Sequence, residues 1–119
     1  SLNCKVGAIV KSLLFKAKNT FILCLVAGDK KASLIKIKKT INVKDVSMAS
    51  ADEVKKVTGF TIGGVSPVGH LNKIDIYIDN SLERFDNLYA AAGHPNCVFK
   101  IDYIKLQKLT NGLVKEISE

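Results

Sequence analysis

The clearest pattern along the chain is a series of short apolar and alternating segments, separated by glycine, asparagine and other turn-forming residues. Residues 74–78 read Ile, Asp, Ile, Tyr, Ile, which is typical of a half-buried strand. Residues 9–15 and 20–26 are rich in β-branched and aromatic types, and the polar residues 16–19 between them predict a hairpin. Further strands are expected at residues 43–48, 88–92, 97–101 and 113–117.

Helices are predicted where a capping residue precedes a stretch with helical spacing. Ser50, with Glu53 three residues later, forms a capping box for a helix through residue 58, and Gly59 ends that helix. Further helical segments are expected at residues 32–40, 80–85 and 102–109. The first of these also fits a strand, because apolar and lysine residues alternate within it.

The order of these elements is not the regular strand and helix alternation of a doubly wound sheet. It predicts a mixed α+β domain with a curled, barrel-like β-sheet and short surrounding helices. With 119 residues, of which 47% are apolar and 24% charged, the chain fits a single globular domain. The longest apolar run, residues 21–27, is too short to cross a bilayer, and no signal peptide is visible. A cytoplasmic protein without a membrane partner is therefore expected.

The excess of basic residues indicates which class of partner to consider. Eighteen basic residues against eleven acidic ones give a net charge of +7. A basic surface attracts phosphates, so nucleic acid is the first partner class to consider. A lysine-rich surface that only contacts solvent is the alternative. Aromatic residues make up 7% of the chain and tryptophan is absent, which argues against a general module that binds RNA through stacked bases.

The cysteine and histidine residues provide few candidates for catalysis or metal binding. Cys4, Cys24 and Cys97 are an odd number without a short metal-ligand spacing, so each is expected to be a small buried apolar residue. A catalytic thiol is the alternative. His70 and His94 each follow a glycine in an expected loop, where they can reach a ligand or be mere bystanders. Neither a metal nor a cofactor is expected.

Residues 59–69 are the most unusual stretch. They hold four of the eight glycines and one of the two prolines. Clustered glycines allow positive φ and let another molecule approach the backbone, so the stretch is suited to present main-chain groups. A turn-rich crossover is the alternative. The stretch lacks the Gly-Lys-Ser/Thr of a phosphate-binding loop, the dinucleotide-binding pattern and a Gly-x-Ser-x-Gly elbow.

Lys11 stands in an otherwise apolar strand. Burying an ammonium without a partner is costly, so its position calls for an explanation. If the side chain reaches a cleft, it can hold a phosphate or a carbonyl oxygen. If the strand simply alternates, the side chain points to solvent.

Four blocks of sequence, taken in order, resemble the YbaK/ProX family of trans-editing aminoacyl-tRNA deacylases and the similar editing insertion of bacterial prolyl-tRNA synthetases. The blocks are Ile9–Phe15, Leu25–Asp29, Gly59–Gly69 and Ala92–Pro95. The resemblance runs over essentially all 119 residues. Residues 1–119 are thus expected to be one editing domain. Leu2 and Asn3 look like the end of a helix with no helix before it, which suggests that the family's N-terminal segment is missing.

The resemblance implies hydrolysis of the ester between a wrongly attached amino acid and the terminal adenosine of a tRNA. It assigns the catalytic role to Lys11, Gly63, Gly64 and Pro67, and substrate binding to Val65, Ser66, Gly93 and His94. Main-chain groups around residues 63–67 are expected to face the scissile carbonyl, and a hydroxyl of the terminal ribose to help activate water. A histidine after Gly93, where some family members have lysine, favours editing of alanine or another small residue.

The same resemblance implies the partners. These are the acceptor end of a mischarged tRNA and, as a further candidate, an aminoacyl-tRNA synthetase, for a protein that is a monomer or a homodimer. A catalytically silent relative that only binds tRNA or another nucleic acid is the alternative.

Overall fold

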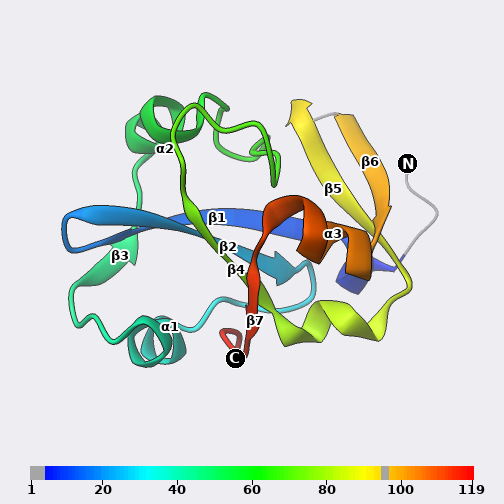
Figure 1. The fold of residues 1–119 in the computed structure, drawn as a ribbon, viewed down its shortest axis with the longest axis horizontal. Helices are drawn as coiled ribbons and strands as arrows, with labels where there is room; N and C mark the ends of the chain where they lie inside the picture. The colour runs from blue at the N-terminus through cyan, green and yellow to red at the C-terminus, as the bar shows by residue number, and fades with distance from the viewer. Residues whose placement is uncertain (1–4, 95–96) are drawn as a thin grey trace.

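The computed structural model describes residues 5–94 and 97–119, which form a five-stranded sheet, a two-stranded ribbon and three α-helices (Figure 1). The elements are η1 (Val6–Ala8), β1 (Val10–Ala17), β2 (Thr20–Ala27), α1 (Leu34–Ile41), β3 (Val46–Met48), α2 (Ala51–Thr58), β4 (Asp75–Asp79), η2 (Asn80–Arg84), β5 (Asn87–His94), β6 (Cys97–Asp102), α3 (Tyr103–Thr110) and β7 (Leu113–Lys115). The mixed α+β class is therefore confirmed. Pro95 of the fourth sequence block, together with Leu2, Asn3 and Cys4, lies outside the described residues.

The five-stranded sheet has the order β3-β1-β2-β4-β7. Strands β1 and β2 form an antiparallel hairpin, β3 pairs antiparallel with β1, and β4 is parallel to both β2 and β7. Its edges, β3 and β7, do not pair with one another, so the sheet is curled but is not a closed barrel. Strands β5 and β6 form a separate antiparallel ribbon, which meets the start of β1 through a bridge between Ile9 and Tyr89.

The predicted hairpin is confirmed, but its turn is shorter than expected. Lys16 and Ala17 continue β1, because Ala17 is buried and Lys16 forms an ion pair with Glu53 of α2 at 3.7 Å. The chain reverses over Lys18 and Asn19 alone, and Lys18 takes the left-handed conformation with φ of 57°.

The segment that fitted both a helix and a strand is the helix α1. The Ser33 hydroxyl accepts a hydrogen bond from the Lys36 amide at 3.2 Å, and Asn42 ends the helix in the left-handed conformation. The capping box of Ser50 and Glu53 at the start of α2 is present, and Gly59 ends α2 with φ of 85°. These caps satisfy backbone groups that a helix end leaves unpaired.

The remaining boundaries differ by a few residues from those expected. Asp102 caps α3 by accepting a hydrogen bond from the Lys105 amide at 2.7 Å, as predicted. The strand β3 covers only residues 46–48. The strand β5 runs on to His94, so Gly93 and His94 lie at the end of a strand and not in the connection after it.

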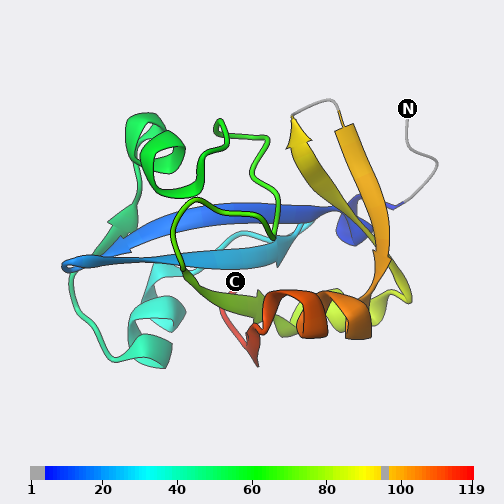
Figure 2. The same cartoon turned by 45° about the horizontal axis from the view of Figure 1, so that its top comes forward.

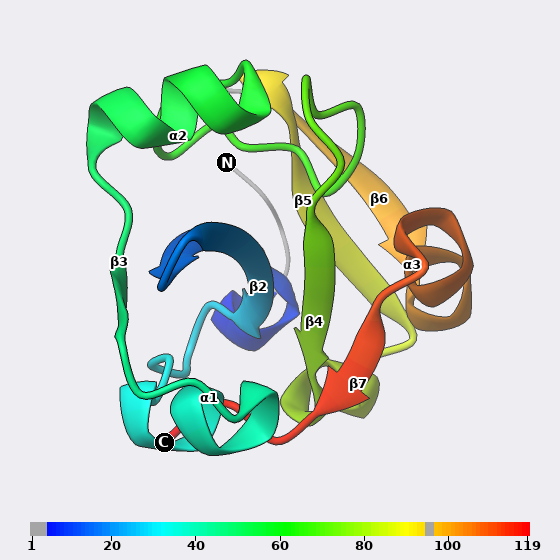
Figure 3. The ribbon, with the colours of Figure 1, turned by 60° about the vertical axis from the view of Figure 1, so that its left-hand side comes forward.

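The β1–β2 hairpin separates two groups of buried side chains, with α2 on one side and α1 on the other (Figure 3). The first core, on the α2 side, includes Leu14, Leu25, Val54, Leu88 and Leu106. The second core, on the α1 side, includes Phe15, Cys24, Val26, Ile37 and Ile117. Successive residues of a strand point to opposite faces, so the alternating side chains of β1 and β2 supply both cores.

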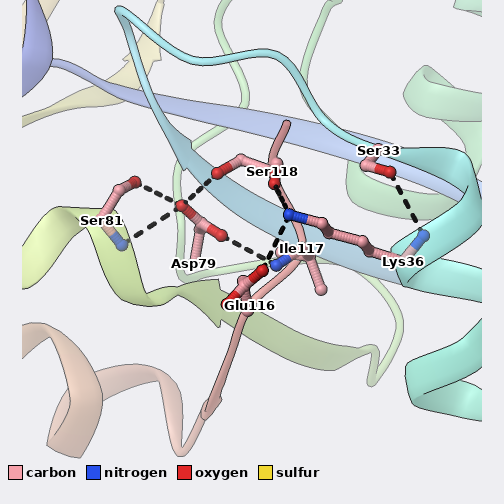
Figure 4. Close-up of polar contacts among 7 residues, drawn as sticks. All are labelled: Ser33, Lys36, Asp79, Ser81, Glu116, Ile117 and Ser118. Carbon is pink, nitrogen blue, oxygen red and sulfur yellow. Dashed lines mark hydrogen bonds and ion pairs between the residues drawn. The ribbon is translucent and has the colours of Figure 1, made fainter.

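Asp79 fastens the C-terminal tail to the sheet (Figure 4). Its carboxylate is fully buried and accepts hydrogen bonds from the Ile117 amide at 2.8 Å, the Ser118 hydroxyl at 2.8 Å, and the amide and hydroxyl of Ser81. Burial by itself raises the pKa of Asp79, but the hydrogen bonds from Ser81, Ile117 and Ser118 outweigh it and lower the pKa. Lys36 of α1 holds the same tail by donating to the Ser118 carbonyl at 2.7 Å.

The two described cysteines differ. Cys24 is fully buried, and burial together with the nearby charge of Asp79 raises the pKa of its thiol to about 12. Cys97 is exposed at the start of β6, so the expectation of a buried side chain is wrong for it. Cys97 pairs with His94 at the end of the β5–β6 ribbon, and neither residue belongs to the first or the second core. In the described part of the chain, no helix has the length and hydropathy needed to cross a bilayer.

Candidate functional site

A cavity of about 390 Å³ lies between β1, the loop that follows α2, and one side of the β5–β6 ribbon. In Figure 2 this loop descends between α2 and the ribbon, over β1. The lining residues are Ile9, Val10, Lys11, Ser12, Leu13, Leu14, Met48, Ala49, Val54, Ile62, Gly63, Val65, Tyr89, Ala91 and Val98. Most of these are apolar, so the few polar groups stand out.

Three of the residues that the resemblance singled out border this cavity. Lys11 comes from β1, whereas Gly63 and Val65 come from the glycine-rich loop. These residues are far apart in the sequence, and the fold brings them to one cavity. The candidate site is therefore centred on β1 and residues 63–65.

Lys11 borders the cavity, and its ammonium is held by a backbone carbonyl and not left in solvent. It lies opposite Val26, and directly opposed residues of antiparallel strands share a face, so its side chain starts on the side of the second core. The residue is half-buried, and its ammonium donates a hydrogen bond to the Lys30 carbonyl. An ammonium has further N–H donors beyond this one. Lys11 is thus anchored beside the cavity with donors to spare.

The glycine-rich loop is held by its own hydrogen bonds. The Gly64 amide donates to the Thr61 carbonyl at 2.9 Å, and His70 Nε2 donates to the Ser66 carbonyl at 2.6 Å. The Ser66 hydroxyl accepts from the Val68 amide at 3.3 Å. Gly64 and Ser66 are both buried and engaged within the loop, and neither lines the cavity.

Three loop residues that line the cavity, Ile62, Gly63 and Val65, have amides that are left for a ligand. Within the described part of the chain, these amides donate to no protein acceptor. Gly63 has φ of 85°, and a Cβ at this position would meet no atom within 4 Å. The backbone at Gly63 is therefore open to the cavity, as the composition of the loop suggested.

The other predicted site residues lie away from the cavity. Pro67 borders a different hollow, which it shares with His70 and Leu109. Gly93 packs against Phe60 at the end of β5. His94 is exposed at the end of the same strand and does not line the cavity. Gly93 and Pro67 therefore do not border the cavity themselves.

Two residues with polar side chains, Ser12 and Tyr89, line the cavity but were not among the predicted site residues. Ser12 lies opposite Leu25 of the first core, so its side chain faces the cavity side of β1. Its hydroxyl oxygen is buried, and it is the one buried side-chain polar atom of the described residues that has no hydrogen-bond partner. Tyr89 is the second. Ser12 could have been found from the sequence, because alternation along β1 places it on the opposite face from Lys11, among apolar neighbours. Nothing in the sequence distinguished Tyr89 from a residue that only packs in the core.

The chemistry available in the cavity is limited. None of the described residues that line it carries a carboxylate or an imidazole. In residues 5–94 and 97–119, no group of three or more His, Cys, Asp and Glu side chains is arranged to hold a metal ion. The polar groups at hand are the Lys11 ammonium, the Ser12 hydroxyl, the Tyr89 phenol and the free amides of the loop residues Ile62, Gly63 and Val65.

Comparisons with solved structures agree with this architecture. A structure described as a candidate trans-editing enzyme for prolyl-tRNA synthetase superposes with a TM-score of 0.94 at 35% identity, covering 98% of this chain and 73% of that one. The hypothetical protein APE2540 superposes with a TM-score of 0.89 at 28% identity, covering 97% of this chain and 77% of that one.

Sequence comparisons point the same way. The proline–tRNA ligase of Caldicellulosiruptor bescii is 35% identical over 83 residues, which are 70% of this chain but only 14% of the ligase. The uncharacterized protein YwhH of Bacillus subtilis is 34% identical over 102 residues, which are 85% of this chain and 64% of that protein. The chain thus corresponds to a small part of the ligases that it matches. Because the aminoacyl-tRNA editing domain model matches residues 1–109, the chain belongs to the aminoacyl-tRNA editing domain family.

Proposed function

We propose that this chain removes wrongly attached amino acids from tRNA by hydrolysing the aminoacyl ester in the cavity between β1, the glycine-rich loop and the ribbon. The observation that supports this proposal most is the meeting of Lys11, Gly63 and Val65 at one cavity. Lys11 comes from one block of the family resemblance, and Gly63 and Val65 come from another. A nearly apolar cavity with a few directed donors is suited to a small aminoacyl group.

The reaction requires water to attack the ester carbonyl carbon. The bond from this carbon to the ribose oxygen then breaks, the ribose oxygen takes a proton, and a free amino acid and a tRNA with a free 3′ end result. Negative charge develops on the carbonyl oxygen in the transition state, and fixed backbone N–H groups stabilise such a charge. The free amides of Gly63 and Val65 are the candidates for this role.

Proton transfer has to be arranged without a carboxylate or imidazole among the described residues that line the cavity. We propose that the neighbouring hydroxyl of the terminal ribose orients the attacking water, as the family resemblance implies. The ester is already activated, so placing water and ester in the right geometry supplies much of the rate enhancement. Lys11 would contribute its remaining N–H donors to the terminal phosphate or to the ester carbonyl.

The bound amino acid would also satisfy Ser12. The buried hydroxyl of Ser12 lacks a partner, and an α-ammonium group in the cavity could donate to its oxygen. The side chain of the amino acid would then meet apolar residues such as Leu14, Ala91 and Val98. This environment favours a small apolar side chain such as that of alanine. Shape alone discriminates weakly, by about 1–3 kcal/mol per methylene.

The test is deacylation of a panel of tRNAs charged with alanine, cysteine, serine or threonine. The expected result is hydrolysis of at least one of them, with alanine preferred, and a large loss of kcat/KM in Lys11→Met. Lys39→Met is the matched control, because Lys39 is exposed on α1, on the other side of the hairpin from the cavity. If none of the four tRNAs is hydrolysed, while tRNA still binds regardless of its charging, the chain is a binding relative and the hydrolase proposal is wrong.

A further inference from the structure

The β5–β6 ribbon presents two different sides. Tyr89 pairs with Lys100 and Ala91 pairs with Val98, so these four residues share one side. Tyr89, Ala91 and Val98 line the cavity, whereas Leu88, Ala90 and Ile101 on the opposite side belong to the first core. We name the first set the cavity side of the ribbon. Lys100 lies on this side, next to the cavity wall and exposed to solvent.

Tyr89 has a ring available for stacking. It is the only aromatic residue among the described residues that line the cavity, and it is partly exposed. Elsewhere in the described part of the chain, no aromatic ring or cation stacks on it, and no group hydrogen bonds to its hydroxyl. A partly exposed ring at a cavity wall offers an apolar face to a planar ligand.

Lys100 has a charge available for an anion. Among the described residues it forms no ion pair, whereas Lys16 and Lys36 are paired with glutamates. Its direct pairing with Tyr89 places the two Cβ atoms about 5 Å apart. An aromatic face beside a free lysine is the combination that binds a base by stacking and a phosphate by charge.

We propose that the cavity side of the ribbon is a subsite for a nucleoside monophosphate unit, with the base stacked on Tyr89 and the phosphate held by Lys100, which leaves the Lys11 ammonium for the ester carbonyl. This inference rests on the proposed function, in which the unit is the 3′-terminal nucleotide that carries the ester. With the aminoacyl group in the cavity, the attached ribose lies at the cavity wall, and Tyr89 is the aromatic residue within reach there. The exposed large apolar side chains among the lining residues, those of Met48, Ile62 and Val98, are not aromatic.

Binding of AMP and of adenosine to the intact chain, followed by NMR chemical shifts, tests the subsite. In the unmodified chain, AMP should shift the amides of Tyr89, Lys100 and their neighbours. Tyr89→Leu should weaken AMP binding about tenfold, and Tyr89→Phe should retain it, because stacking requires only the ring. Lys100→Gln should weaken AMP and leave adenosine unchanged, whereas the control Lys39→Gln should change neither. AMP that fails to bind the unmodified chain, or that binds Tyr89→Leu and Lys100→Gln as tightly as the unmodified chain, would overturn the proposal.

Kinetics with charged tRNA separate a tRNA terminus from a free nucleotide as the ligand. If the subsite binds the tRNA end, Tyr89→Leu and Lys100→Gln should raise KM with little change in kcat. An unchanged KM alongside intact hydrolysis would contradict the inference and leave the proposed function standing. A third outcome is that both variants lose AMP binding, while the unmodified chain hydrolyses no charged tRNA. This outcome would contradict the proposed function, and the subsite would then be a site for free nucleotides.

Discussion

Gly93 and Phe60 are in direct contact, so that a Cβ added to Gly93 would lie 3.0 Å from Cε1 of Phe60. The Phe60 ring in turn meets the His70 ring edge-on, with centroids 6.0 Å apart and an interplanar angle of 82°. His70 donates to the Ser66 carbonyl. This series of contacts connects the end of β5 to the glycine-rich loop. It gives Gly93 and His70 a structural part in shaping the site, although neither lines the cavity.

Gly93→Ala should therefore destabilise the protein for two reasons. Gly93 has φ of 90°, which costs a residue with a side chain about 1–2 kcal/mol, and the new methyl group would press on Phe60. Gly63→Ala is a matched control, because Gly63 has φ of 85° but open space at its Cβ. Urea unfolding should show a larger loss for Gly93→Ala than for Gly63→Ala. Equal losses would mean that the contact with Phe60 contributes nothing.

Ser12→Ala should lower activity without lowering stability. The Ser12 hydroxyl is buried without a partner, and such a group costs the folded protein about 1–3 kcal/mol. Its removal should keep or raise the melting temperature, while KM for charged tRNA rises because the α-ammonium loses an acceptor. Ser47→Ala, at an exposed position of β3, is the control and should change neither quantity. A clear drop in the melting temperature of Ser12→Ala would show that the hydroxyl has a structural partner.

Asp79→Asn should weaken the protein most at neutral pH. The lowered pKa of Asp79 means that its ionised form stabilises the fold above the ordinary carboxyl pKa of about 4, and that this contribution is lost as the pH falls through the folded-state value. Replacement of a buried, charged acceptor should cost about 2 kcal/mol at pH 7. The cost should shrink at pH 3.

Thermal or urea unfolding of both proteins at pH 7 and pH 3 measures this difference. Asp75→Asn is the matched control on the same strand, because Asp75 is exposed. A cost for Asp79→Asn that stays the same at both pH values would show that the charge of Asp79 does not hold the tail.

The two described cysteines should differ strongly in reactivity. The pKa of Cys24 is raised to about 12 by burial and by the charge of Asp79, so its reactive thiolate is scarce at pH 8. Cys97 is exposed. With iodoacetamide at pH 8, peptide mass spectrometry should find Cys97 alkylated and Cys24 protected until the protein is unfolded. Rapid labelling of Cys24 in the native protein would contradict its position in the second core.

Local signals in the sequence determined most of the secondary structure. Each of these signals acts within a few residues, so it can be recognised without knowing which distant segment packs against it. They are the alternation in residues 74–78, the caps Ser50 and Asp102, and the helix end at Gly59. The four blocks of sequence, taken together, also sufficed to identify the family. These features depend on local hydrogen bonding and on the period of each element.

Tertiary structure decided which of the marked residues share a site. Whether residues 32–40 form a helix depended on the burial of Ile37 in the second core. The surroundings of Ser12 and Tyr89 depended on the bridge between Ile9 and Tyr89, which joins the ribbon to the start of β1. Packing of the sheet decided that Ser12 faces the first core and Lys11 the second. Packing of the loop brought Gly63 and Val65 to the cavity, but not Gly64, Ser66 and Pro67. A sequence pattern gives the side of an element on which a residue lies, but the neighbour it meets there is fixed only when that element packs against the rest of the fold.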